Sequence, residues 1–149
     1  SEKIAIISLP LFDSLAVKPF YMTSKEWGGA QSNFGKSINY EGLPMSDVFK
    51  YNTIGMSIDQ AVSLLDLDKP NYIKMDVDGI EHLILKGATS TLQNVESLLI
   101  EVNDNFIKQA DDVKKYLTKT GFKLKHKKRS ELVAKSKYSS FYNQIWIRQ

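Results

Sequence analysis

The stretch YIKMDVDGIEHLILKGA, residues 72–88, decides the fold. Its first four residues, 72–75, predict a short buried strand that runs directly into Asp76, Asp78 and Glu81. An apolar pattern with helical spacing then follows. A strand, a tight turn and a helix make the basic unit of an α/β sheet. The carboxylates therefore fall where the strand ends, and open parallel sheets bind their ligands at that position.

A second apolar strand is predicted at residues 97–102, SLLIEV, with Glu101 near its end. Near-continuous apolar runs of this kind are typical of parallel strands that are buried on both faces. If the two strands are neighbours, about 4.8 Å separates them, and Asp76 and Glu101 converge on one crevice. There the two side chains can serve as a general base, as acceptors for ligand hydroxyl or ammonium groups, or as ligands for Mg²⁺ or Ca²⁺. An acid that closes a buried strand needs a partner, which favours a functional role for Asp76.

Other residues of the same turn have structural explanations. Glu81 lies in the first turn of the predicted helix, where a carboxylate complements the helix dipole. Asp78 is a good helix N-cap, and Gly79 permits a tight strand-to-helix turn. His82 is a single histidine in this helix, and we expect a packed or surface side chain rather than a metal ligand.

The first third of the chain predicts strands and a long loop. Residues 3–12 and 15–22 predict two strands that pair with each other, and Pro10 and Pro19 place them at sheet edges or strand ends. Residues 26–44 are polar and glycine-rich, and they predict a long loop. Loops of this length in compact domains are usually functional or mobile.

The second half of the chain alternates helices and strands. Ser57 and Gln60 fit a capping box that opens a helix. A second amphipathic helix is expected at residues 111–118, and residues 121–128 and 140–149 alternate with period two, which predicts an antiparallel pair. The predicted fold is an α/β layered sheet, mostly parallel, with an antiparallel C-terminal edge pair.

Length and composition describe an ordinary globular protein. The 149 residues fit one domain, 1–149, with a sizeable core. Cysteine is absent, which excludes disulfides and thiolate metal sites and suits a reducing cytoplasm. No apolar run approaches the roughly 20 residues that span a bilayer, and the start has no signal-peptide pattern. We therefore expect a cytoplasmic protein that does not bind membranes.

Positive charge is concentrated at the C-terminal end. Residues 120–149 carry a net charge of +7, which leaves −4 for the rest of the chain. Such a basic run can attract a phosphate, a nucleic acid or an acidic substrate. The run has no interleaved aromatic residue on which bases could stack. A solvated edge hairpin, whose lysines discourage edge-to-edge pairing, is therefore favoured over a nucleic-acid site.

The stretch at residues 72–88, followed by VESLLIEVN, resembles the FkbM family of S-adenosylmethionine-dependent methyltransferases. That family has Lys, Ile or Met, Asp, x, Glu, Gly, x and Glu, then Leu-Lys-Gly-Ala and an apolar strand that closes on Glu. The upstream segments TIGMSIDQAV and IAIISLPLFDS are also similar. Two positions depart from the family pattern. Asp78 replaces a Glu, and Asn103 stands where the family often has a histidine base.

The resemblance implies a Rossmann-like methyltransferase sheet and methyl transfer to a sugar or natural-product hydroxyl, with S-adenosylmethionine as the cofactor and a small-molecule or carbohydrate acceptor. It implies catalytic roles for Asp76 and Glu101, with Glu101 on the acceptor or on a divalent metal. Cofactor contacts are expected from Pro10, Leu11 and Asp76. The expected substrate-binding residues are Trp27, Ser32, Asn33 and Asn103.

The sequence also lacks the family's first two strands and the glycine-rich loop that grips the cofactor. We therefore expect a fragment of a longer enzyme or a rewired domain. A fragment would leave a sheet edge exposed beside residues 72–75, through which a homodimer could form.

Two other functions fit parts of the sequence. Strand-Asp-x-Asp-Gly is similar to haloacid-dehalogenase-like phosphatases. That family wants Thr after the Gly and the motif on the first strand, whereas here Ile80 follows and the motif lies mid-chain. A methyltransferase-like domain without cofactor loops could instead be a catalytically inactive binding or assembly module.

Overall fold

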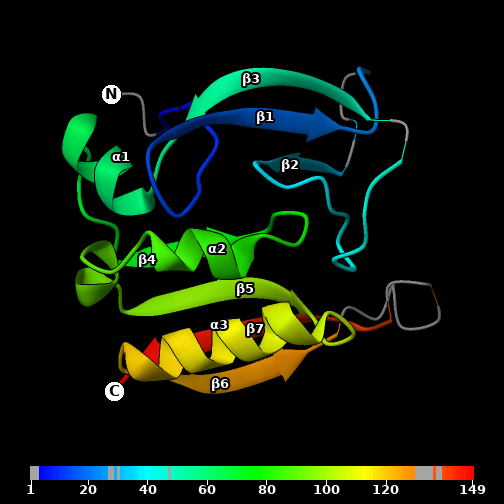
Figure 1. Cartoon of the computed structure of the whole chain (residues 1–149). Helices are drawn as coiled ribbons and strands as arrows, with labels where there is room; N and C mark the ends of the chain where they lie inside the picture. Colours follow the sequence, from blue (N-terminus) through cyan, green and yellow to red (C-terminus); the bar gives the residue numbers. More distant parts are fainter. Residues whose placement is uncertain (1–3, 27–28, 30, 47, 130–135, 137–138) are drawn as a thin grey trace.

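The computed structural model describes residues 4–26, 29, 31–46, 48–129, 136 and 139–149, and it contains two sheets with helical segments beside and between them (Figure 1). The strands are β1 (Ala16–Met22), β2 (Ser32–Phe34), β3 (Phe49–Gly55), β4 (Tyr72–Met75), β5 (Ser97–Asn103), β6 (Phe122–Lys128) and β7 (Phe141–Arg148). The helices are α1 (Ile58–Leu64), α2 (Glu81–Lys86), the 3₁₀ helix η1 (Thr91–Asn94) and α3 (Ile107–Lys119).

The larger sheet has the strand order β4-β5-β7-β6. β4 and β5 are parallel neighbours, as predicted, with Met75 opposite Ile100. β7 pairs antiparallel with both β5 and β6, which confirms the antiparallel pair at the C-terminal edge. The prediction of a mostly parallel sheet was wrong. Because β7 inserts between β5 and β6, two of the three strand pairings are antiparallel, and the sheet is mixed but compatible with a Rossmann-like fold.

The core lies against one face of this sheet. Leu98, Ile100 and Val102 of β5 have no exposed surface, while the residues between them are partly exposed. β5 is thus fully buried on one face only, because side chains alternate along a strand. Leu85 of α2 and Val113 of α3 are also fully buried in the same cluster. Figure 1 shows α3 running across the sheet beside β7 and β6.

The smaller sheet is antiparallel and has the order β2-β1-β3. The strand predicted at residues 15–22 is confirmed as β1, but Pro19 lies in the central strand rather than at an edge. Pro19 is tolerated because β2 pairs only with the residues after it, so its missing N–H has no place in the ladder. Its carbonyl accepts from Gly35 N–H on that same side at 2.8 Å.

The strand predicted at residues 3–12 was wrong, as was its pairing with β1. The described residues 4–10 form no strand, and Leu11 makes one isolated parallel bridge to Met56. β2 lies inside the predicted loop at residues 26–44, and β3 was not predicted. Apolar alternation favours a strand only where a neighbouring strand accepts its hydrogen bonds.

The helices follow their sequence signals closely. Ser57 and Gln60 form the predicted capping box, with both hydrogen bonds at 3.1 Å. α3 starts four residues before its predicted position and extends to Lys119. The N-cap of α2 is Ile80 and makes no side-chain cap bond, so the prediction that Asp78 caps this helix was wrong.

Both sheets contribute to one hydrophobic cluster. Phe12 and Phe34, from the N-terminal region, are each 1% exposed and pack edge to face with ring centroids 5.5 Å apart. They belong to the same cluster as Leu85 and Leu98. The N-terminal region is therefore fixed against α2 and the larger sheet by apolar contact.

Candidate functional site

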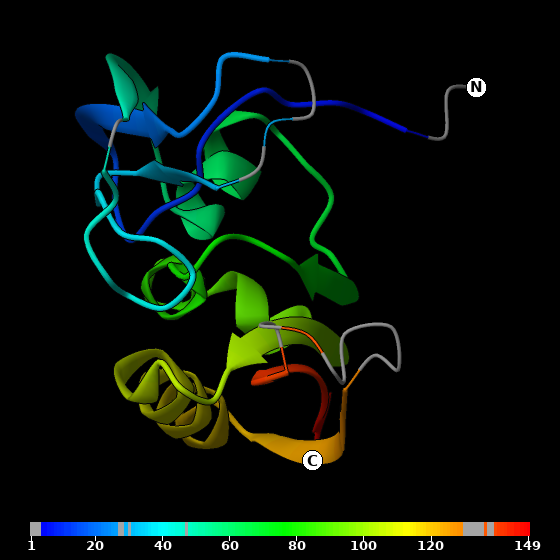
Figure 2. The same cartoon turned by 90° about the vertical axis from the view of Figure 1, so that its right-hand side faces the viewer.

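A cavity of about 500 Å³ lies between the segment before β1 and the carboxyl end of β4. Figures 1 and 2 show the smaller sheet on one side of β4 and α2 and the other strands of the larger sheet on the opposite side. The predicted site residues that line this cavity are Pro10, Leu11, Ser32, Asn33 and Asp76. The structure therefore brings together five positions that lie between residues 10 and 76 of the sequence.

Apolar side chains form most of the remaining wall. They come from the segment before β1, from both sheets, from α1 and α2, and from the turn that joins β4 to α2. They are Leu9, Phe20, Phe34, Ile58, Ile73, Met75, Val77, Ile80 and Ile84. The charged residues in the wall are Lys74, Asp76 and Asp78. An apolar cavity with a few grouped polar side chains is typical of small-molecule sites.

The turn after β4 is held by β2. Asp78 Oδ2 accepts from the Ser32 N–H at 3.2 Å, and Asn33 Nδ2 donates to the Asp78 carbonyl at 2.7 Å. Gly79 has φ +100°, and a Cβ there would lie 2.9 Å from the Asn39 carbonyl oxygen. Glycine is therefore required by both conformation and space, as the tight-turn prediction anticipated. Asp78 docks β2 onto the turn, a role that its sequence context did not indicate.

Asp76 is accessible from solvent. Its carboxylate pairs with Lys74 Nζ at 2.8 Å, and the two side chains are 52% and 64% exposed. The partner that an acid at this position needs is thus the lysine two residues earlier on the same strand. Because the pair is exposed, Asp76 keeps free lone pairs with which it can accept hydrogen bonds from a ligand.

Glu101 is the residue next to Asp76 on the adjacent strand, because the parallel register pairs Met75 with Ile100. Glu101 does not line the cavity itself. Burial raises the pKa of its carboxyl group, and the nearby charges of Asp76 and Asp78 raise it further. A carboxylate with a raised pKa is a stronger base, which suits proton acceptance from a hydroxyl group.

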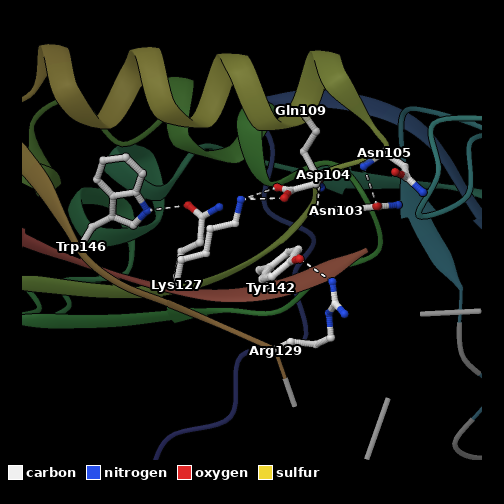
Figure 3. Close-up of polar contacts among 9 residues, drawn as sticks. Asn103, Asp104, Asn105, Gln109, Lys127, Arg129, Tyr142 and Trp146 are labelled. Atoms are coloured by element: carbon white, nitrogen blue, oxygen red, sulfur yellow. Dashed lines mark hydrogen bonds and ion pairs between the residues drawn. The ribbon is translucent and has the colours of Figure 1, made fainter. Parts of the chain in front are cut away.

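Asn103 is buried and occupied by neighbouring backbone groups (Figure 3). Its Nδ2 donates to the Tyr40 carbonyl at 3.0 Å, and its Oδ1 accepts from Asn105 N–H at 3.0 Å. Its backbone N–H donates to Gln109 Oε1 at 2.9 Å, and Gln109 in turn donates to the Glu81 carboxylate. The structure places Asn103 outside the cavity, where it fixes the end of β5.

Glu81 and His82 are buried in α2. Glu81 occupies the first turn, as expected, but it is 1% exposed rather than solvated. Burial raises the pKa of Glu81 to about 8, although its backbone hydrogen bonds and Gln109 oppose the shift. His82 is a packed side chain, as predicted. It lies edge to face on Phe106, and burial lowers its pKa to about 4.

The remaining predictions concern Trp27, a metal site and a membrane-spanning helix. Trp27 is outside the described residues. Phe34, which lies in the predicted loop at residues 26–44, lines the cavity. Across the described part of the chain, no three His, Cys, Asp or Glu residues gather as a metal site, so binding of Mg²⁺ by Asp76 and Glu101 has no third such ligand there. None of the described helices is long and apolar enough to cross a bilayer.

The basic run forms the edge strand β6, as predicted. Phe122, the first residue of β6, is buried, and the other six residues of the strand are exposed. Lys127 pairs with Asp104 at 2.6 Å, and Lys127 and Arg129 both lie over the Tyr142 ring of β7 (Figure 3). The sequence did not predict this aromatic contact, because Tyr142 belongs to the neighbouring strand and not to the basic run.

A mixed α/β sheet with a cavity and acidic side chains at the carboxyl end of a parallel strand is typical of enzymes that bind small molecules there. The sequence profile described as the Methyltransferase FkbM domain matches residues 15–124, and the chain belongs to this family. A relative, the hexuronic acid methyltransferase AglP of Haloferax volcanii, is 34% identical over 83 residues, which cover 50% of this chain and 34% of the relative. The matched part thus spans about a third of that relative's length. No solved structure matches the chain.

Proposed function

We propose that this protein is an S-adenosylmethionine-dependent methyltransferase that methylates a hydroxyl oxygen of a sugar or a similar small acceptor. The observation that carries the proposal is the position of the family's motif. Asp76 lines the 500 Å³ cavity, and Glu101 follows on the neighbouring strand. The activity for which the Haloferax relative is named supports a sugar as the class of acceptor.

The cavity wall fits the cofactor in its chemistry. Pro10 and Leu11 supply an apolar surface on which a flat purine ring can pack, and Asp76 and Asp78 supply acceptors for hydroxyl or ammonium groups. When bound, S-adenosylmethionine supplies an electrophilic methyl group. The chain then needs only to orient an oxygen nucleophile and to accept its proton.

The side chains divide this work in our proposal. Asp76 accepts a hydrogen bond from the reacting hydroxyl and orients it. Glu101, with its raised pKa, accepts the proton. Ser32 and Asn33 line the part of the cavity wall that faces the sugar substrate. Asn103 holds the end of β5 in place, since direct contact with an acceptor would require its bonds to Tyr40 and Asn105 to break.

The first experiment is a calorimetric titration of the protein with S-adenosylhomocysteine. We expect saturable binding at micromolar concentrations. A folded protein that shows no binding would contradict the proposal and favour the inactive binding or assembly module. Asp68→Asn, a change at an exposed aspartate that does not line the cavity, is the matched control for Asp76→Asn.

Transfer of a labelled methyl group tests the role of Glu101. Glu101→Gln should lower kcat by roughly 10²–10⁴-fold, the usual contribution of a general base. Glu96→Gln, just before the same strand, should leave kcat unchanged because Glu96 contacts Asn71 and Tyr72 at the other end of β4. Equal effects of the two changes would contradict the assignment.

The free edge of β4 is the site through which we propose that two copies pair. β4 ends the larger sheet, and Tyr72 is 69% exposed. Unpaired edge strands offer N–H and C=O groups to a second chain. Sedimentation velocity should show a concentration-dependent dimer, and a monomer at every concentration would contradict this pairing.

A further inference from the structure

The charged groups of the cavity wall leave a net negative charge. Asp76, Asp78 and Lys74 are its charged side chains, and the Lys74 ammonium is already paired with Asp76 at 2.8 Å. One carboxylate charge is therefore not balanced within the wall. Glu101 lies within the same field: burial raises the pKa of its carboxyl group, the charges of Asp76 and Asp78 raise it further, and Lys74 lowers it.

The backbone N–H of Ser32 and the side-chain amide of Asn33 do not offset this negative charge, because they already donate hydrogen bonds within the protein. The Ser32 N–H donates to Asp78, and the Asn33 amide donates to the Ile38 and Asp78 carbonyls at 2.6 and 2.7 Å. These donors are turned toward the protein. Asn33 Oδ1 is buried without a partner, and it is an acceptor. A carboxylate in the cavity would thus meet like charge at this wall, and the ammonium of the wall is already paired.

We infer that the acceptor is electrically neutral around its reacting hydroxyl, as in an uncharged sugar or polyol, and that the cavity discriminates against uronic acids. The inference deepens the proposed function and rests on it. It separates this protein from the Haloferax relative, whose name specifies a hexuronic acid. A uronate would need a free cation near its carboxylate, and Lys74 is the cation of the wall and is paired.

The test is a ligand-observed NMR titration with two probes, methyl β-D-glucoside and methyl β-D-glucuronide. Their rings match and their charges differ. One net charge at about 6 Å in a water-like dielectric changes affinity by about threefold. We therefore expect the glucoside to bind about threefold more tightly at low salt. The difference should shrink at high salt, because the charges are close to solvent.

Asp78→Asn removes the unbalanced charge while keeping an oxygen that can accept from Ser32 N–H. We expect it to remove the difference between the probes, whereas Asp68→Asn should preserve it. If the Asp78 variant does not fold, the salt series on the unchanged protein decides alone.

Three results would overturn the inference: tighter binding of the glucuronide, a preference that salt does not alter, or no binding of either probe. The S-adenosylhomocysteine titration reports separately on the proposed function. Cofactor binding together with a preference for the glucuronide would overturn the inference and leave the proposed function intact.

Discussion

The two sheets bury their side chains very differently. In the larger sheet, Leu98 and Ile100 have no exposed surface. In the smaller sheet, Val17 and Ile54 face each other across β1 and β3 and are 68% and 52% exposed. The cavity lies between the sheets, so one of its walls comes from the partly exposed edge strand β4 and the buried helix α2, and the other comes from a sheet with an open outer face. Stability should therefore depend mainly on the larger sheet, and the smaller sheet should mainly shape the site.

The largest effect that tests this comparison is the loss of a core side chain. Leu98→Ala should lower the free energy of unfolding by about 2–5 kcal/mol, because it removes buried methyl groups and leaves a void. The exposed counterpart Val17→Ala should change it by less than about 0.5 kcal/mol. Urea denaturation measures both. Similar losses in the two variants would show that the sheets contribute equally.

The buried Glu81 predicts an unusual pH dependence. Its carboxyl pKa is about 8 in the folded protein and about 4.5 when unfolded, so the folded state binds the proton more tightly. The contribution of Glu81 to the free energy of unfolding should be greatest below pH 4.5, and it should fall as the pH rises toward 8. One proton limits the slope to about 1.4 kcal/mol per pH unit.

Glu81→Gln should flatten this dependence, because the amide keeps an oxygen for Gln109 and carries no charge. The exposed Glu41→Gln is the control. Urea midpoints measured from pH 5 to pH 8 give the slopes. A slope that survives in the Glu81 variant would mean that another group controls the titration.

A smaller effect is expected where β2 and its following loop meet the turn after β4. Gly79 and Gly121 both have positive φ, but a Cβ at Gly121 would find its nearest neighbour at an ordinary 3.5 Å. Gly121→Ala should therefore lose about 1–2 kcal/mol from the backbone conformation alone. Gly79→Ala should lose more, because the Asn39 carbonyl must move. Equal losses would mean that the turn is not tightly docked.

The smallest effect is expected at the exposed pair of Lys74 and Asp76. Lys74→Ala should leave the unfolding midpoint unchanged, since exposed ion pairs contribute little to stability. It should nevertheless weaken binding of the glucuronide probe further, because the cavity wall loses its positive charge. A large shift in the midpoint would show that the pair is structural.

The sequence predicts the larger sheet far better than the smaller one. β4, the turn, α2 and β5 follow from local apolar patterns, and all four occur where they are expected, although β4 is largely exposed and β5 is fully buried on one face only. β3 carries mostly exposed residues, so its seven residues show no alternation of buried and exposed positions. Residues 4–10 have the apolar pattern of a strand but have no strand partner among the described residues. Pairing is a tertiary property that a single segment does not encode.

The site also contains one feature that the sequence predicts and two contacts that it does not. The adjacency of Asp76 and Glu101 follows from the parallel pairing of two predicted strands. The contact of Asp78 with Ser32 spans 46 residues, and that of Glu81 with Gln109 spans 28. Neither contact has a local signature, because each joins side chains and backbone groups that only the complete fold brings together.

The position of β7 has a consequence for how the protein is made. β7 is an inner strand of the larger sheet but comes after all of its neighbours in the chain. During synthesis, β5 and β6 cannot be joined until residues 141–148 have left the ribosome. Until then the nascent chain presents two open strand edges, a state in which sheets are prone to pair with other chains. Chaperone protection should therefore matter most until β7 has emerged from the ribosome.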